Sequence, residues 1–196
     1  MRKLIIYELN EIPQKLLEEY ILFRPNSTLS YIYKKGVFKK TITSDIGELH
    51  PWSTWPTFYR GVDNTKHCLK FINQDKSFAD KKFPAVWDLL YRKKISIGIF
   101  GSLQSYPPPK RNKYVKFYLP DTFSPDSKAY PKKLETFQKF NLAMVSNNSG
   151  EVRSIRRVEI KYLLNCIFNS IFNFKSIIKI LIQIIKERIN KKFKKR

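Results

Sequence analysis

The chain is organised around a polar, turn-rich and aromatic stretch, which from residue 44 to residue 57 reads Ser44-Asp45-Ile46-Gly47-Glu48-Leu49-His50-Pro51-Trp52-Ser53-Thr54-Trp55-Pro56-Thr57. Thr54 stands where the N-cap of a short helix is expected, with Pro56 inside its first turn. A hydroxyl there faces unpaired backbone N–H groups and the positive end of a helix dipole, which suits phosphate binding. The spacing by itself favours a simpler alternative, in which Thr54 only caps the helix.

Around this stretch, apolar runs alternate with amphipathic segments. The first run ends in Glu8, and open α/β sheets gather their ligands at the carboxyl ends of such strands. The pattern predicts an α/β fold, a three-layer sandwich with a mainly parallel sheet. The expected strands are 3–9, 37–43 and 95–100, with 114–119 as a fourth strand or an extended edge, and the expected helices are 13–22, 27–35, 83–91 and 132–142.

Composition limits the classes of partner. The 196 residues are 42% hydrophobic, enough for a buried core, and carry a net charge of +22. Such a charge attracts nucleic acid, anionic membranes or phosphorylated substrates alike, although an AT-rich genome also produces many lysines. Cys68 and Cys166 form no metal-spaced pair, which favours a reducing, cytoplasmic environment.

The character of the chain changes after a linker at 146–150, so we expect one domain over 1–150 and a basic helical segment over 151–196. This segment holds 13 Lys and Arg against 3 Asp and Glu, and it reads as one long helix or two. Its apolar face, built from Ile and Leu between residues 177 and 185, is flanked by Lys175, Lys179 and Lys186. Either the face lies on an anionic membrane surface, or it packs on protein outside this chain.

The ordered motifs resemble the N-terminal half of an alkaline-phosphatase-like hydrolase, in the branch of type I phosphodiesterases, nucleotide pyrophosphatases and sulfatases, including members from surface-polysaccharide loci. The resemblance rests on the acidic end of the first strand, the segment 51–57, the Gly61 to His67 element, and the segments 83–106 and 120–123. It implies Thr54 as the nucleophile, Glu8 and Thr54 as ligands of a divalent metal, zinc, and Asn73 as a phosphate-binding residue. His67 is then structural.

The sequence departs from this family in ways that bear on activity. Glu8 replaces the usual Asp, and His50 and His67 are the only histidines, so a two-metal site cannot be completed. We therefore expect a truncated piece of a longer enzyme, or a remnant without activity. The implied substrate is a phosphorylated or sulfated small molecule or glycan. A basic membrane-surface or nucleic-acid-binding protein without catalysis is the alternative, and of its two partners nucleic acid is the less favoured.

Overall fold

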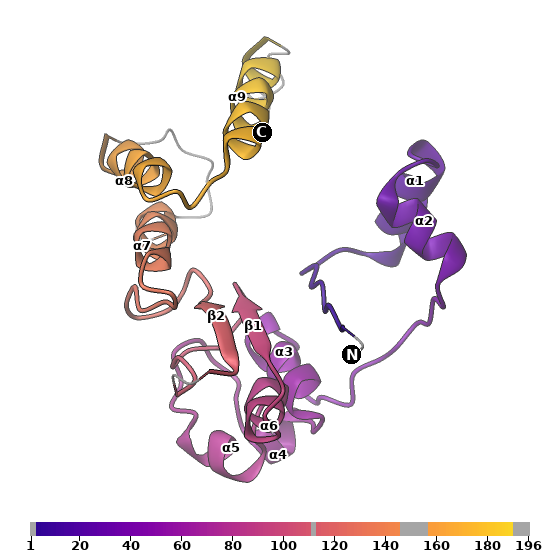
Figure 1. The fold of residues 1–196 in the computed structure, drawn as a ribbon. Coiled ribbons are helices and arrows are strands. Elements are labelled where there is room, and N and C mark those ends of the chain that lie inside the picture. The colour runs from indigo at the N-terminus through magenta and orange to yellow at the C-terminus, as the bar shows by residue number, and fades with distance from the viewer. Residues whose placement is uncertain (1–2, 111–112, 146–156, 190–196) are drawn as a thin grey trace.

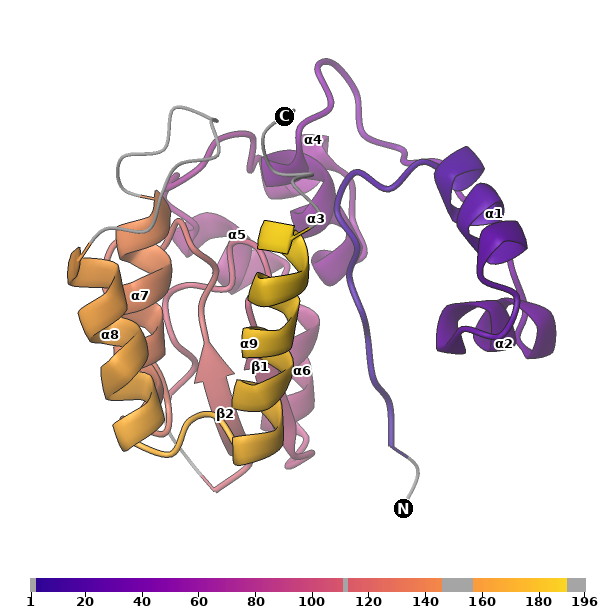
Figure 2. The same cartoon turned by 90° about the horizontal axis from the view of Figure 1, so that it is seen from above.

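The computed structural model describes residues 3–110, 113–145 and 157–189, and it is a mixed α/β protein with one small parallel sheet. A central body holds the sheet, an N-terminal arm carries two helices, and a C-terminal group of three helices lies on the other side (Figures 1 and 2). The elements are α1 (Gln14–Phe23), α2 (Thr28–Lys35), α3 (Pro51–Arg60), α4 (Asn64–His67), α5 (Ser77–Lys82), α6 (Val86–Arg92), β1 (Ile97–Phe100), β2 (Val115–Leu119), α7 (Leu134–Val145), α8 (Arg157–Phe168) and α9 (Phe174–Ile189).

The sheet pairs β1 with β2 in parallel, which confirms the strand predicted near 95–100 and shows that 114–119 is a strand and not an extended edge. Ile97 and Ile99 of β1 point into the core, where α6 covers them with partly buried apolar side chains. Gly98 lies opposite Phe117 in the register, and a Cβ atom on Gly98 would stand 2.2 Å from the Phe117 ring. A glycine is needed there because the ring of the neighbouring strand occupies the side-chain position.

The strands predicted at 3–9 and 37–43 are absent from the described structure, so those two predictions are wrong. Both segments run as extended chain without a neighbouring strand. Leu4 and Ile5 are 82% and 87% exposed. An apolar, β-branched run becomes a strand only when another strand accepts its backbone hydrogen bonds, and that partner is not decided by the run itself.

The two helices of the N-terminal arm lie where the sequence predicts them. Ser27 caps α2 by accepting a hydrogen bond from the Ser30 amide at 3.2 Å, and the chain leaves the helix at Gly36. These local signals suffice because a helix satisfies its hydrogen bonds within its own residues.

The C-terminal segment forms two helices rather than one, and α8 packs against α7. Between α8 and α9 the chain turns at Ser170, whose φ of 52° is left-handed. The predicted linker at 146–150 lies outside the described residues. Among the described helices, none has both the length and the apolar character needed to cross a bilayer.

Candidate active site

Helix α3 carries the Thr54 segment, but it begins earlier than the sequence predicts. His50 is the N-cap and Pro51 is the first helical residue, so Thr54 lies inside the first turn. The expectation of an N-cap at Thr54 is wrong, because proline at the first position has a φ already suited to a helix. The Thr54 amide bonds to the His50 carbonyl at 2.9 Å, and the Thr54 hydroxyl donates to the same carbonyl at 3.1 Å.

Pro56 has an unexpected consequence for the site. A proline inside a helix has no N–H to offer the carbonyl four residues earlier, which here belongs to Trp52. The Gln104 side-chain amide donates to that carbonyl at 2.6 Å and so replaces the missing bond. Gln104 belongs to the loop after β1, so the proline ties α3 to the carboxyl end of the sheet.

Glu8 is held against the same helix. The Tyr59 hydroxyl donates to its Oε2 at 2.7 Å, and the Ser102 hydroxyl donates to its Oε1 at 3.3 Å. One turn earlier on α3, Trp55 donates its indole N–H to Asn10 at 2.9 Å. Burial and the Glu8 carboxylate raise the pKa of Tyr59, which keeps its hydroxyl protonated as a donor. The end of the N-terminal run therefore lies beside α3 and the carboxyl end of β1.

A cavity of about 410 Å³ opens at the carboxyl ends of both strands. The loops after β1 and β2 line it together with the Trp52 side chain and the segment that leads into α5. Asn73, in a left-handed turn with φ of 58°, is among the lining residues, whereas Thr54 and Glu8 are not. The structure therefore brings Asn73 together with Trp52, and no hydrogen bond among the described residues joins Glu8 to Thr54.

The cavity wall is built on a buried carboxylate. Asp121 is 7% exposed and accepts the backbone N–H groups of Gln104 and Phe123 at 2.8 and 2.7 Å. Burial raises the pKa of Asp121, while these two N–H groups oppose the rise. The Lys76 ammonium, which also lines the cavity, donates to the Gln104 carbonyl. Gln104 thus connects α3, α5 and the loop after β2.

His67 is the centre of a second network, which is structural. The Leu69 amide donates to Nδ1 at 2.9 Å, so the neutral ring carries its proton on Nε2, 2.9 Å from the Thr57 hydroxyl. Thr57 in turn donates to Asp45 at 2.6 Å, and Asp45 accepts the Asn64 amide at 2.8 Å. The ring is 1% exposed, and burial lowers the pKa of His67. This network holds the loop before α3 against α3 and α4.

The lowered pKa of His67 predicts a pH dependence of stability. Below the unfolded-state pKa of about 6.5, the unfolded chain binds a proton that the folded ring resists, so stability falls as the pH falls. We expect the free energy of unfolding to decline from about pH 6.5 downward, with a slope of at most about 1.4 kcal/mol per pH unit. This slope is measured by urea titrations of the protein and of the His67→Gln variant, which lacks the ionisable ring. An equal slope in the variant between about pH 5.5 and 6.5 would assign the decline to other groups.

The described residues do not fit a closed metal site. Both Glu8 oxygens accept hydroxyl hydrogen bonds, and the Thr54 hydroxyl is directed to a carbonyl. Within residues 3–110, 113–145 and 157–189, no three His, Cys, Asp or Glu side chains gather as a group able to hold an ion. The ligands that the resemblance requires beyond Glu8 and Thr54 would have to come from elsewhere.

Sequence reasoning missed three residues of this region: Gln104, Lys76 and Asp121. A signal existed for Gln104, because Pro56 inside a helix predicts an orphan carbonyl that needs a distant donor. Nothing in the spacing of Lys76 or Asp121 indicates the cavity. Comparison with protein-family models, with curated proteins and with solved structures finds no match for this chain.

Proposed function

We propose that the chain is part of a metal-dependent phosphoric- or sulfuric-ester hydrolase in which the Thr54 hydroxyl is the nucleophile. One observation carries the proposal. Glu8, the helix that bears Thr54 and a ligand-sized cavity with Asn73 in its wall all adjoin the carboxyl ends of parallel β1 and β2. This is the edge where open α/β sheets bind ligands.

The finer fold is part of the same proposal. We propose an alkaline-phosphatase-like three-layer arrangement, in which the extended run 3–9 lies beside the carboxyl end of β1. The Ser102 to Glu8 hydrogen bond supports this, because Ser102 follows β1 by two residues. The exposed apolar side chains of the run supply the packing surface that such an arrangement would bury.

The residues of this chain supply the nucleophile and its placement. Oγ of Thr54 would form a bond to the phosphorus as the ester oxygen leaves, and water would then release the phosphoryl group from Thr54. Asn73, which the resemblance implies as a phosphate-binding residue, lines the cavity and would contact the substrate there. Glu8 and Thr54 are proposed as two oxygen ligands of a zinc site whose other Asp and His ligands lie outside this chain. The test compares hydrolysis of a chromogenic phosphodiester by this chain with hydrolysis by a form that also carries the additional Asp and His ligands.

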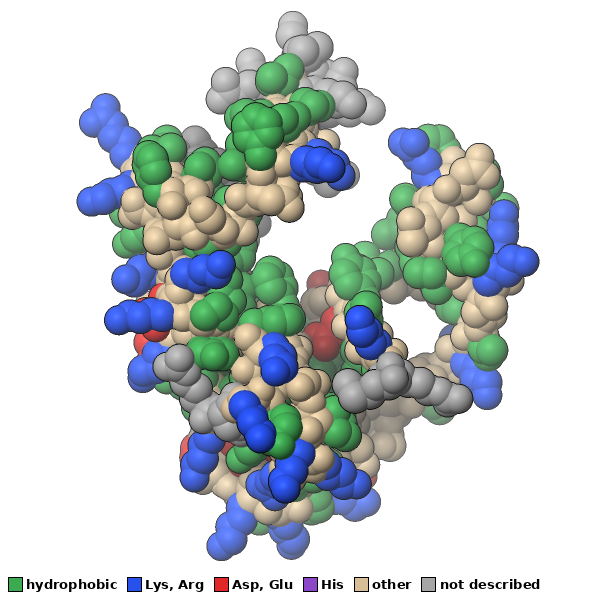
Figure 3. All heavy atoms as spheres, viewed as in Figure 1, with side chains coloured by type: hydrophobic (Ala, Val, Ile, Leu, Met, Phe, Trp, Pro, Cys, Tyr) green, Lys and Arg blue, Asp and Glu red, His purple; other side chains and the backbone are tan. Residues whose placement is uncertain are grey.

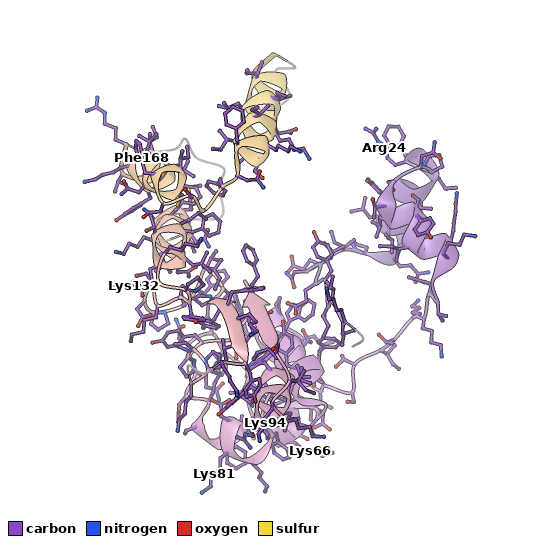
Figure 4. The ribbon with its side chains drawn as sticks, viewed as in Figure 1. Arg24, Lys66, Lys81, Lys94, Lys132 and Phe168 are labelled. Carbon is purple, nitrogen blue, oxygen red and sulfur yellow. The ribbon has the colours of Figure 1, made fainter. Side chains whose placement is uncertain are left out.

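A second candidate function rests on α9. Its apolar side chains Phe174, Ile178, Leu181 and Ile185 share one face, and they are between 41% and 75% exposed. Lys175 and Lys179 flank that face, and Figure 3 shows the hydrophobic side chains of α9 with lysine beside them. Phe168, at the end of α8, is 82% exposed (Figure 4). We propose that α9 lies on an anionic membrane surface. Its apolar side chains would enter the acyl-chain region, and its lysines would face the anionic headgroups.

Vesicle binding tests this candidate. We expect the protein to sediment with phosphatidylserine-containing vesicles, and expect Leu181→Ser with Ile185→Ser to abolish binding. Replacing Lys175 and Lys179 with Gln should weaken binding about 30-fold, since each lysine near an anionic surface contributes about 1 kcal/mol.

The matched control removes the same charge elsewhere. Lys66 and Lys81 are exposed and lie at the end of the central body away from α9 (Figure 4). Lys66→Gln with Lys81→Gln should bind as the unmodified protein does. Equal weakening by both lysine pairs would indicate attraction by net charge alone. No binding to the phosphatidylserine-containing vesicles would mean that another protein covers α9.

A further inference from the structure

Lys76 is the one lysine among the side chains that line the cavity, within the part of the chain that the structure describes. It is half-buried, and its Nζ donates to the Gln104 carbonyl. No ion pair joins Lys76 to a carboxylate among the described residues. The nearby Asp80 is instead paired with Arg60 at 2.6 Å, and the Arg60 side chain is only 4% exposed. The amine therefore faces the cavity with a neutral partner.

The rest of the lining selects against anionic ligands. Three carboxylates line the cavity beside Lys76, and two of them, those of Asp75 and Asp121, have no ion pair among the described residues. They would repel an anion, so Lys76 is poorly placed to bind a phosphate as a simple counter-charge. The apolar wall includes Trp52 and Phe123, whose rings meet edge to face with centroids 4.9 Å apart. Such a wall suits a small, uncharged, planar molecule.

We propose that this cavity is a covalent binding site for a small uncharged aldehyde, which forms an imine with Lys76. The lone pair of Nζ bonds to the carbonyl carbon as the C=O π electrons move to oxygen. One proton passes from nitrogen to that oxygen, and a second follows as water leaves and the C=N bond forms. The net change is amine plus aldehyde to imine plus water, with no oxidant or reductant. The site does not depend on the proposed ester hydrolysis.

The electrostatics of the cavity support this chemistry. Burial lowers the pKa of Lys76 to about 8. The positive charge of Arg60 also lowers this pKa, whereas the Asp80 carboxylate raises it. At about pH 8 roughly half of the Lys76 amines are neutral. The neutral fraction of an exposed lysine at the same pH is only about 1 in 300. Only the neutral amine attacks a carbonyl, so Lys76 has the larger reactive fraction.

Reductive trapping tests the proposal on the whole chain. The folded protein is treated with benzaldehyde and cyanoborohydride, and the benzylated fraction of each lysine is read by peptide mass spectrometry. We expect Lys76 to be labelled at least about tenfold faster than the exposed Lys66, Lys81 and Lys94 at about pH 8. Its rate should level off above about pH 8, while theirs continue to rise.

Two controls separate the cavity from simple amine reactivity. Lys81→Arg should leave the labelling of Lys76 unchanged, whereas Lys76→Arg should remove the fast site. A bulky aldehyde, periodate-oxidised dextran, should lose the preference because its polymer chain is far larger than the cavity of about 410 Å³. Uniform labelling, or a pH profile for Lys76 that matches the exposed lysines, would overturn the proposal. Equal selectivity with the bulky aldehyde would also overturn it, since the cavity would then play no part.

Discussion

Purified alone with added zinc, the 196-residue chain is expected to hydrolyse a chromogenic phosphodiester no faster than buffer does. A form extended past Arg196 to supply Asp and His ligands is expected to turn over, and to lose at least ~1,000-fold in kcat when Thr54 becomes alanine. The reason for the first result is the number of ligands. Catalytic zinc usually keeps about three protein ligands per ion, and Glu8 and Thr54 are only two ligand residues.

Variants of the extended form separate chemistry from folding. Thr54→Ser keeps a hydroxyl and should retain activity, whereas Thr54→Ala leaves no nucleophile on α3 at that position. Thr28→Ala is the matched control, because Thr28 is exposed on α2, in the N-terminal arm away from the central body. Turnover by the isolated chain that disappears in Thr54→Ala would show that no further ligands are needed. An active extended form that tolerates Thr54→Ala would disprove the nucleophile.

Replacing Gln138 with leucine is expected to lower the free energy of unfolding by about 2–3 kcal/mol. Gln138 of α7 is fully buried, and its amide donates to the Asp121 carbonyl at 2.8 Å and to the Ser124 hydroxyl at 2.9 Å. Leucine has a similar size but leaves both acceptors without that donor, and Ser124 is itself buried. Thermal unfolding should show the midpoint about 5–10 °C lower in a chain of this length.

The adjacent Lys139→Leu variant is the control for this measurement. Lys139 occupies the next position on the same helix and is exposed, so its replacement should change stability by less than about 0.5 kcal/mol. Similar losses in both variants would indicate that α7 is sensitive to any substitution. A stability unchanged in Gln138→Leu would mean that the loop after β2 does not depend on α7 for its position.

Much of the helical structure could be predicted from the sequence, as could strand β1. The helices over 13–22, 27–35 and 83–91 are present as α1, α2 and α6, with the two ends of α2 near Ser27 and Gly36. The start of α3 was missed by several residues because two prolines compete as start signals, and Pro51 rather than Pro56 occupies the first position. The strands at 3–9 and 37–43 were predicted from apolar runs that pair with nothing in the described chain.

The sequence by itself determined the features that depend on near neighbours along the chain: the helix caps, the apolar face of α9 and the amphipathic pattern of α6. These follow from backbone hydrogen bonds and side-chain periodicity within a few residues. Only the tertiary structure decided which runs became strands, which donor satisfied the Trp52 carbonyl and where the cavity opened. It also decided the lowered pKa of Lys76, because desolvation depends on side chains that come from α3 and from the loops after β1 and β2. Pairing and burial join residues far apart in the sequence, and no local pattern records them.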